Sequence, residues 1–438
     1  MPIPINYRTM PISPEDVKTI LQAETDSFGT FFNLDRMLYH EGRYSRIAAS
    51  RYPEFRAMCG VPSIKCTQRN DVRNIFMRRF NVPEYKLTNK DGKVSMAQDV
   101  VDKLLKDETL GQDAHHFLEL YNDISSAEYM ASYLGQYLSL PISNVEDMDN
   151  QRMVVAHPEW KGLATSRFSA SSPSVQNINR DICDIYTAPK GWQLVFSDSG
   201  QIEPRITYSA YIRDDLIVKL ITMYDDAYYG LLHFILLTDE EERNLRSNLD
   251  SIKLHEVTAE MKGKRQRLKV LGLAGNYGSS NLASIATELG PLYEKKIVNH
   301  PARKALEAEV TAAVRNGAEF FNGYFGTRVY PDNTQKYHKG DSSWAGHMIR
   351  CGINNPIQTT AAELMCISVM NAKRILGPKD HIGSYKYDEG MFYVRNEHVE
   401  ELAPKLRECL SYAVEGWIPI GSDLHIGRKE SPYVTNIF

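Results

Sequence analysis

The stretch Phe196–Arg205, which reads FSDSGQIEPR, decides the fold of this chain. It follows a short apolar run, Trp192–Phe196, that predicts a buried strand, and a helix-like stretch begins at about Ile202. Asp198 would therefore lie at the edge of a sheet, where a carboxylate reaches solvent or a metal ion while its backbone stays fixed. An aspartate between a strand and a helix is more often a helix N-cap, so this stretch alone does not establish a site.

A second acidic stretch, Tyr387–Glu389, lies between two β-prone runs. Residues 382–387 and 391–394 would form a hairpin whose turn, at residues 388–390, displays two carboxylates. Aspartate and glycine are common in turns, so this stretch by itself also fits an ordinary turn. If Asp198 and the hairpin converge on one sheet, however, their oxygens can hold two Mg²⁺ ions about 4 Å apart, the arrangement that serves phosphoryl transfer.

A third stretch, Arg265–Gly278, is basic at its start and contains three glycines. On a helix, every fourth residue from position 265 advances by only about 40° and so belongs to one stripe. The stripe carries, in order, Arg265, Lys269, Leu273 and Tyr277. Cations and an aromatic ring on one face suit a nucleotide, whereas a solvated basic face is the alternative for the neighbouring cations. Three glycines in seven positions weigh against an ordinary surface helix, because each costs up to about 1 kcal/mol relative to alanine. Close approach of another segment, or a helix that moves, would explain them.

The three stretches resemble the three motifs of the polymerase module of family A DNA polymerases, the bacterial DNA polymerase I type, and they follow one another along the chain in the family's order. The stretch at Asp198 resembles motif A, with the pattern D-x-x-Q-I-E-x-R. The stretch at Arg265 resembles motif B, with the pattern R-x3-K-x7-Y-G, and the acidic pair after Tyr387 resembles motif C. Two further stretches strengthen the resemblance. Thr165–Ile178 resembles the family's T-G-R-L-S-S-x-x-P-N-L-Q-N-I segment, and Arg350–Ala362 resembles its R-x3-N-x-P-x-Q-G-T-A-A helix. From the residues themselves, we expect Pro356 to open a helix that runs to about Leu376, because proline is tolerated in the first turn. The resemblance is specific from about residue 165 onward and weaker from about residue 63.

The resemblance implies an α+β, right-hand polymerase fold with an antiparallel palm sheet, helical fingers and a helical thumb. It divides the chain into a lead-in of unclear role (1–62), the thumb and start of the palm (63–164), the palm with motif A (165–224), the fingers with motif B (225–345) and the palm with motif C (346–438). Within the fingers, the stretch Leu236–Leu254 looks like an insertion.

The resemblance also implies a template-directed DNA polymerase, a nucleotidyltransferase that extends a primer with dNTPs by a two-metal-ion mechanism. Asp198, Asp388 and the backbone carbonyl of Ser199 would bind two Mg²⁺ ions, with Glu389 supporting the site. The nucleotide would contact Gln201, Glu203, Arg265, Lys269, Leu273 and Tyr277. Glu203 would crowd the 2′ position of the sugar and exclude ribonucleotides. Primer-template DNA would contact Arg167, Gln176, Asn177, Arg350, Asn354 and Gln358.

Some positions depart from the family pattern. Leu273 stands where the family places Phe or Tyr, and Tyr387 replaces the motif C histidine. The triphosphate-contacting histidine of the fingers has no clear match, although Tyr228 lies at about the right distance. These departures affect the contacts to sugar, primer end and phosphate, and leave the carboxylates in place.

Composition sets limits on the class of protein. The 438 residues suggest about three domains or one large subdivided one. No apolar run approaches the roughly 20 residues of a membrane span, and we expect no membrane partner. Six scattered cysteines without a CxxC pair, and no secretory signal, predict a cytoplasmic protein with reduced thiols, in the host cytoplasm if it is phage-encoded. A formal net charge of −4 means that any nucleic-acid binding must come from local patches.

Two expectations concern what surrounds the polymerase activity. About 60 residues before the first family-like helix are too few for a 3′-5′ exonuclease domain, so we expect a compact phage or viral type of enzyme without proofreading, with a separate exonuclease or processivity factor. An RNA-synthesising or reverse-transcribing relative is an alternative of the same class, and Glu203 argues against RNA synthesis. A catalytically silent nucleic-acid-binding replication factor is the alternative of another class. The joint presence of Asp198, Lys269, Asp388 and Glu389 argues against it.

Overall fold

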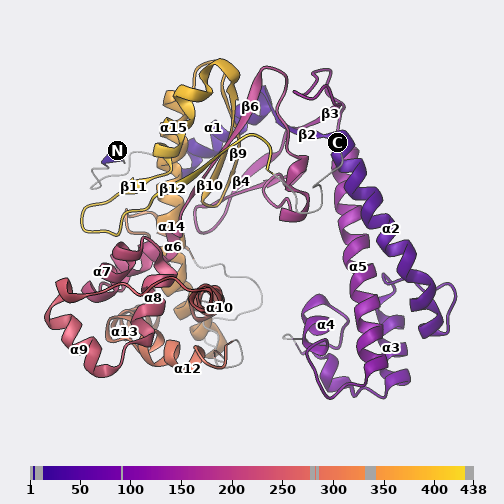
Figure 1. Cartoon of the computed structure of the whole chain (residues 1–438), viewed down its shortest axis with the longest axis horizontal. Coiled ribbons are helices and arrows are strands. Elements are labelled where there is room, and N and C mark those ends of the chain that lie inside the picture. The colour runs from indigo at the N-terminus through magenta and orange to yellow at the C-terminus, as the bar shows by residue number, and fades with distance from the viewer. Residues whose placement is uncertain are drawn as a thin grey trace. The chain divides into compact units, whose positions relative to one another are not determined.

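The structure is a computed structural model that describes residues 3–4, 13–89, 92–276, 282, 286–330 and 342–429 (Figure 1). Within these ranges, no helix combines the length and the apolar character that a membrane span requires. The chain divides into two compact units, each described by itself below. Unit 1 comprises residues 1–30, 157–177 and 191–428, and unit 2 comprises residues 31–156, 178–190 and 429–438.

Unit 1 is built around a four-stranded antiparallel sheet with the strand order β12-β6-β10-β9 (Figure 1). The strands are β6 (Trp192–Ser199), β9 (His381–Lys386), β10 (Glu389–Arg395) and β12 (Ser422–Ile426). Residues 194–197 of β6 are all buried, which means that both faces of the sheet are covered at this strand. The predicted strand at Trp192 is confirmed, as is a sheet assembled from segments far apart in the sequence.

The hairpin of β9 and β10 positions the second acidic stretch. Lys386 and Glu389 are paired in the register, so the turn consists of Tyr387 and Asp388 alone. Tyr387 has a φ of 56°, in the left-handed region, which allows the chain to reverse within two residues. The predicted hairpin is confirmed, but the prediction placed its turn too late: Glu389 and Gly390 belong to strand β10.

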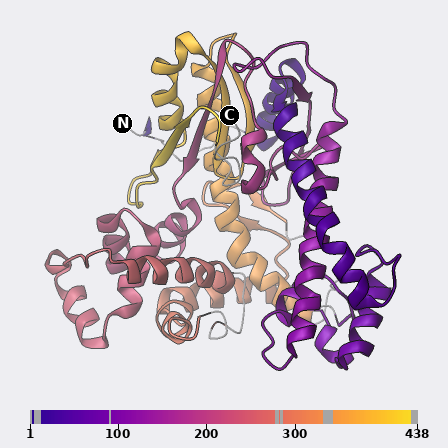
Figure 2. The ribbon, with the colours of Figure 1, turned by 45° about the vertical axis from the view of Figure 1, so that its right-hand side comes forward.

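Two helices contact this sheet, and a third, long helix contacts both of them and extends toward the helical part of unit 1. Helix α15 (Val399–Cys409) contacts β6, β10 and β12, and α1 (Pro14–Ser27) contacts β9. Helix α14 (Ser342–Ile375) contacts both of these helices and also α13 (Pro301–Arg315), and Figure 2 shows it running from the sheet to the helices of residues 202–315.

Helix α14 corrects one prediction. The sequence predicted that Pro356 opens this helix, but Pro356 lies inside it. The residues before the proline stay helical because they pack tightly: a Cβ at Gly352 would lie 2.4 Å from a methyl carbon of Val310 on α13 and 2.6 Å from the ring of Phe321. Tertiary packing here outweighs the usual preference of proline for the first turn.

Residues 202–315 of unit 1 form a helical region with an apolar core of its own. Its helices are α6 (Ile202–Ile206), the π-helix η3 (Thr207–Tyr211), α7 (Asp215–Tyr224), α8 (Ala227–Leu236), α9 (Asp239–Ser247), η4 (Leu249–Ser251), α10 (Ala259–Asn276), α12 (Gly290–Tyr293), the π-helix η5 (Glu294–Val298) and α13. Helices α7 and α8 each begin at an aspartate N-cap, Asp214 and Asp226. Gly230 lets α8 approach α7, because a Cβ there would lie 2.6 Å from the Cα of Ile221.

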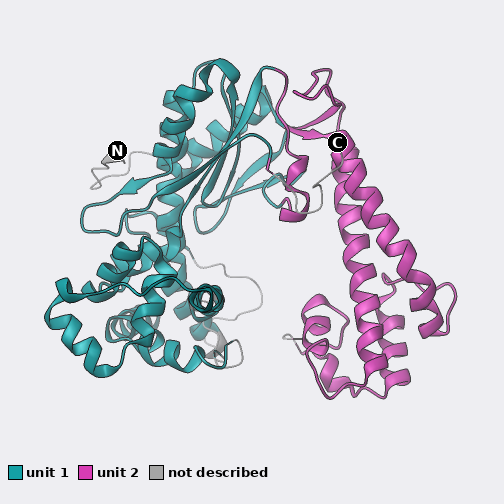
Figure 3. Ribbon diagram, in the orientation of Figure 1, with its two compact units in different colours: residues 1–30, 157–177, 191–428 teal, residues 31–156, 178–190, 429–438 magenta. Residues whose placement is uncertain are grey.

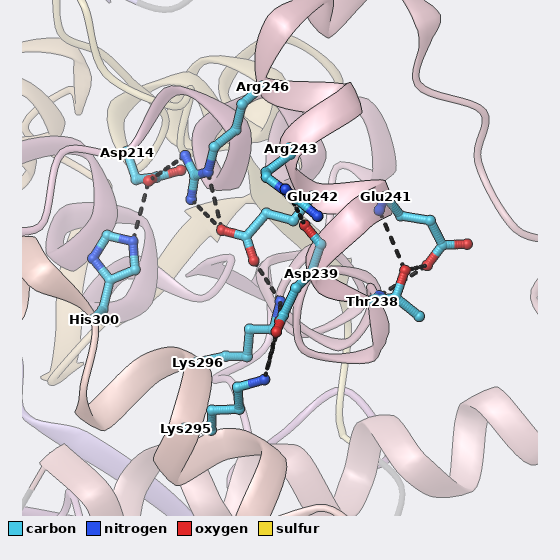
Figure 4. A network of polar contacts seen from close by, with 10 residues as sticks. All are labelled: Asp214, Thr238, Asp239, Glu241, Glu242, Arg243, Arg246, Lys295, Lys296 and His300. Atoms are coloured by element: carbon cyan, nitrogen blue, oxygen red, sulfur yellow. Dashed lines mark hydrogen bonds and ion pairs between the residues drawn. The ribbon is translucent and has the colours of Figure 1, made fainter.

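Within the stretch 236–254, helix α9 is held to its neighbours by a charged network (Figure 4). Arg246 donates to Asp214 at the start of α7 over 2.8 Å and also pairs with Glu242 on its own helix. Further ion pairs involve Asp239, Lys295, Lys296 and His300, and Figure 4 also draws Thr238, Glu241 and Arg243. Because Asp214 also accepts from His300 at 3.1 Å, one carboxylate joins the starts of α7 and α13 to α9.

The remaining elements of unit 1 are short. They are the antiparallel pairs β4 (Glu159–Gly162) with β5 (Phe168–Ser171) and β7 (Phe321–Asn322) with β8 (Arg328–Val329), the parallel pair β1 (Ile3–Pro4) with β11 (Tyr412–Ala413), and η6 (Asn396–His398).

Unit 2, drawn in magenta in Figure 3, is mainly helical. Apart from Thr30, which belongs to unit 1, it contains β2 (Thr30–Asn33), α2 (Leu34–Cys59), α3 (Arg69–Phe80), η1 (Glu84–Leu87), α4 (Gln98–Leu104), α5 (Gln112–Leu138), β3 (Met153–Ala156) and η2 (Arg180–Ile185). Helices α2 and α5 pack along one another, and the buried rings of Phe55, Phe76 and Phe117 meet between the helices. The boundary expected at residue 62 therefore falls between two helices that share a core.

Candidate active site

The two acidic stretches lie side by side in the sheet of unit 1. Glu389 is paired with Asp198 in the register of β10 and β6, and the N–H of Ser199 donates to the carbonyl oxygen of Asp388 over 2.8 Å. Paired residues on neighbouring strands project from the same face, so Asp198 and Glu389 share a face of the sheet. Asp198 is exposed while Ser197 and Ser199 on either side of it are buried. The strand thus presents one carboxylate to solvent from a fixed backbone.

Asp388 lies in a negatively charged environment. Burial raises the pKa of the Asp388 carboxyl, and the negative charges of Glu203 and Glu389 raise it further, while Arg167 opposes them. A divalent cation beside these oxygens would offset the repulsion and favour the ionised form. Hard carboxylate oxygens such as those of Asp388 and its acidic neighbours are the kind of ligand that Mg²⁺ prefers.

In the described part of the chain, no three His, Cys, Asp or Glu side chains converge as a ready-made metal cage. Mg²⁺ in phosphoryl-transfer sites is commonly held by one or two carboxylates together with substrate phosphates and water. The sequence placed Asp198 at a sheet edge, but β6 is an interior strand, and the carboxylates lie where the strands end. A pair of carboxylates at this end of the sheet is compatible with such a site.

Asp423 is a neighbour of the site that the sequence did not reveal. It lies on β12, opposite Asp198 in the register, so Asp423, Asp198 and Glu389 form a row across three adjacent strands. Strand β12 is a short segment without a strong alternation of apolar residues. The only sequence signal was its position after an apolar turn near Ile420, which does not identify a partner strand.

Arg167 and Glu203 form an ion pair next to the hairpin turn. Glu203 lies in the first turn of α6, and Arg167 lies between β4 and β5. The Arg167 guanidinium also lies over the Tyr387 ring, 5.4 Å from its centroid. Two predicted site residues from different motifs therefore meet beside Asp388.

Motif A and helix α10 meet through one further carboxylate. Gln201 donates to Asp226 over 2.6 Å, and Arg265 of α10 binds the same carboxylate through two nitrogens. Lys269 is exposed on α10. The side chain of Leu273 and the whole of Tyr277 lie outside the described residues, so their predicted contacts stay predictions.

The residues predicted to contact DNA differ in their surroundings. Gln176 is buried, and its amide bonds three backbone groups: it accepts from the N–H of Ala170 and donates to the carbonyls of Phe168 and Tyr385. This environment makes Gln176 a structural link between β5 and β9, and its contact with DNA stays a prediction.

The other residues predicted to contact DNA range from exposed to buried. Asn177 is exposed and donates to Ser174 over 2.9 Å. Arg350, Asn354 and Gln358 lie four residues apart on α14 and so share one face of this helix. Arg350 is exposed, Gln358 is half-buried and Asn354 is buried.

The arrangement of helices and strands matches a known structure. A solved structure described as the POL domain of Pol1 from M. smegmatis, in complex with DNA primer-template and dNTP, aligns with 94% of this chain and 69% of that chain, with a TM-score of 0.75 and 20% sequence identity. The chain has the fold of a DNA polymerase I polymerase domain. The right-hand, α+β architecture expected from the sequence is therefore confirmed.

Sequence relatives agree with this fold. The chain is 27% identical to DNA polymerase I of Aquifex aeolicus over 285 residues, which are 61% of this chain and 44% of the relative. It is 25% identical to DNA polymerase I of Pseudomonas aeruginosa over 283 residues, which are 61% of this chain and 28% of the relative. It is 23% identical to the thermostable DNA polymerase I of Thermus filiformis over 379 residues, which are 82% of this chain and 41% of the relative. The chain thus spans less than half the length of these DNA polymerase I relatives. No protein-family model matches it.

Proposed function

We propose that this chain is a template-directed DNA polymerase that extends a primer 3′-hydroxyl with dNTPs. The observation that carries the proposal is the meeting of Asp198 and Asp388 at one end of the sheet, where the strand register and the Ser199 to Asp388 hydrogen bond hold their backbones together. The similarity to DNA polymerase I supports the same assignment.

In this proposal, Asp198, Asp388 and the carbonyl of Ser199 hold two Mg²⁺ ions, with Glu389 alongside. When bound, the ions supply a lowered pKa for the primer hydroxyl and charge neutralisation at the leaving pyrophosphate. The protein fixes the carboxylates on a rigid sheet, which keeps the reacting groups in position.

The nucleotide is held by motifs A and B. Arg265 and Lys269 of α10 bind the triphosphate, and the carboxylate of Glu203 crowds the 2′ position of the sugar. Leu273 and Tyr277 would lie near the sugar and the templating base, with Gln201 at the start of α6. Primer and template contact Arg167, Asn177, Arg350, Asn354 and Gln358, mostly at groups that every base pair presents.

The domain roles follow the same assignment. The four-stranded sheet forms the palm, the helical region around α10 forms the fingers, and unit 2 supplies the thumb. We take the thumb to begin near residue 31 rather than residue 63, because α2 shares a core with α5. The lack of an exonuclease, a phage origin and a separate exonuclease or processivity factor stay predictions. Incubating the pure protein with a mismatched primer end tests the first.

Primer extension on a defined template tests the proposed activity. The purified chain should add each dNTP opposite its complement, and only when Mg²⁺ is present. Asp198→Ala should still bind primer-template but not extend it. A wild-type chain that binds primer-template and never extends it would support a silent binding factor instead, and undiminished extension by Asp198→Ala would remove the proposed site.

A further inference from the structure

Asp226 connects the two segments that the proposed function assigns to the nucleotide. Its carboxylate lies 3.0 to 3.1 Å from Nε of Arg265 and 2.5 Å from Nη2 of the same side chain. It also accepts a 2.6 Å hydrogen bond from Gln201, the residue that precedes α6. One carboxylate therefore links motif A to helix α10, although the three residues are far apart in the sequence.

Asp226 is itself held firmly in place. As the N-cap of α8, it accepts from the N–H of Tyr229 over 2.8 Å. The side-chain amide oxygen of Gln201 accepts a hydrogen bond from the N–H of Ala227, so the Gln201 amide binds both the Asp226 carboxylate and the backbone of the next residue. Burial alone would raise the pKa of the Asp226 carboxyl, but its hydrogen bonds with Arg265, Tyr229 and Gln201 lower it overall. Asp226 is thus ionised at neutral pH.

The Arg265 guanidinium is oriented as well as neutralised. Asp226 engages the edge that carries Nε and Nη2. The rings of Tyr228 and Tyr229 lie 5.6 and 5.3 Å from the guanidinium carbon, within the range of cation–π contacts. Among the described residues, none bonds Nη1, so the remaining edge is available to a phosphate. A guanidinium can bind a carboxylate on one edge and a phosphate on the other.

We propose that Asp226 is a positioning residue that holds the Arg265 guanidinium ready for the incoming triphosphate. The inference rests on the proposed function, in which Arg265 binds that triphosphate. A preoriented arginine loses little conformational freedom when the nucleotide arrives, so the pair with Asp226 increases nucleotide affinity without touching the nucleotide.

The test compares two aspartates that play the same local role. Asp226→Asn keeps a good N-cap for α8 but removes the negative charge that pairs with Arg265. Asp214→Asn is the matched control, because Asp214 also caps a helix and pairs with an arginine, Arg246, in the network of Figure 4. Single-nucleotide incorporation is measured for both variants at varied dNTP concentration, with thermal unfolding to verify folding.

We expect Asp226→Asn to raise KM for dNTP about tenfold, with kcat changed less than about twofold, since a charged hydrogen bond that acts on binding is lost. Asp214→Asn should leave both constants within about twofold. In an Arg265→Ala background, Asp226→Asn should cause no further rise in KM, because its effect acts through the arginine.

A second variant tests the inference if Asp226→Asn folds poorly. Arg265→Lys keeps the positive charge but cannot be gripped along one edge, so it should raise KM by a similar factor. Three results would overturn the inference: an unchanged KM in Asp226→Asn, equal effects of the two aspartate variants, or an additive effect in the Arg265→Ala background. In each case, primer extension by the wild type would still uphold the proposed function. A wild-type chain that incorporates no dNTP overturns both.

Discussion

The N–H of Ser199 donates a 2.8 Å hydrogen bond to the carbonyl oxygen of Asp388. This bond continues the ladder of β6 and β10 past the last paired residues, Asp198 and Glu389, into the turn of the hairpin. The two acidic segments are therefore joined by backbone groups. Their side chains can be replaced without loss of the bonds that bring them together, so substitutions here test chemistry more than folding.

The first prediction concerns the two carboxylates. Asp198→Asn and Asp388→Asn should each lower primer extension by at least about 10³-fold, because each removes a charged ligand for Mg²⁺. Mg²⁺ should also raise the melting temperature of the wild type more than that of either variant. Asp250→Asn, an exposed carboxylate on the Leu249–Ser251 turn, is the control and should behave as the wild type. Full extension by both site variants would contradict the assignment.

The second prediction concerns the choice of sugar. Glu203 lies beside Asp388 and is held by Arg167, so its carboxylate has a fixed place near the proposed catalytic centre. Glu203→Ala should reduce the preference for dNTP over rNTP about 10- to 100-fold, measured as the ratio of kcat/KM values. Glu203→Gln keeps the bulk of the side chain and should retain most of that preference. Equal losses in both variants would mean that charge, not size, discriminates.

The third prediction concerns Gln176. Glutamine at this position holds three buried backbone groups, and Gln176→Ala would leave them without this partner. We expect a loss of about 2 kcal/mol or more in the free energy of unfolding, measured by urea titration. Affinity for primer-template, measured below the unfolding transition, should change little. A large loss of affinity with unchanged stability would instead support the DNA contact predicted from the sequence.

The fourth prediction compares two helical glycines of unit 1. Gly230→Ala should destabilise the protein by about 1–3 kcal/mol, because the new Cβ would lie 2.6 Å from the Cα of Ile221. Gly263→Ala on α10 meets only the tip of Arg267, 4.0 Å away, and should stabilise by up to about 1 kcal/mol. Thermal unfolding shows whether each variant is more or less stable than the wild type. A change in the same direction for both variants would contradict the close packing of α7 and α8.

The fifth prediction concerns pH. Burial and the nearby His255 lower the pKa of His233 to about 4, well below its ordinary value of about 6.5. Between these values the unfolded chain binds a proton that the folded chain does not, so His233 contributes stability above about pH 6.5 that is lost as the pH falls toward 4. His233→Gln should therefore weaken the pH dependence of the free energy of unfolding between pH 7 and 5. The exposed His425→Gln should not.

The sequence allowed the palm to be predicted because its signals are local. The apolar run before Asp198 and the β-prone runs around Tyr387 identify strands without knowledge of their partners. The order of the motifs then supplied the resemblance to family A DNA polymerases and, through it, the expected fold. The turn was placed too late, since Glu389 is a polar residue inside a strand and nothing in its neighbours distinguishes it from a turn residue.

Other features depend on contacts between distant residues and could not be read in advance. Pro356 is tolerated inside α14 because of packing around Gly352, which no local pattern encodes. Asp226 meets Arg265 across 39 positions, and Gln176 bonds the backbone of Tyr385 across 209 positions. Of the glycines in motif B, Gly275 has an explanation, since a Cβ there would lie 2.8 Å from the Tyr293 ring. Gly278 lies outside the described residues.

The strand order of the palm sheet has a consequence for biosynthesis. Strand β6 leaves the ribosome about 190 residues before β10 and still longer before β12, yet it forms hydrogen bonds with both. Until then its two unpaired edges and its buried side chains have no partner strand, a state that is slow to resolve and prone to association with other chains. In a nascent chain of this protein, β6 therefore lacks its partner strands through about half of translation, until the segments that complete the sheet have been synthesised.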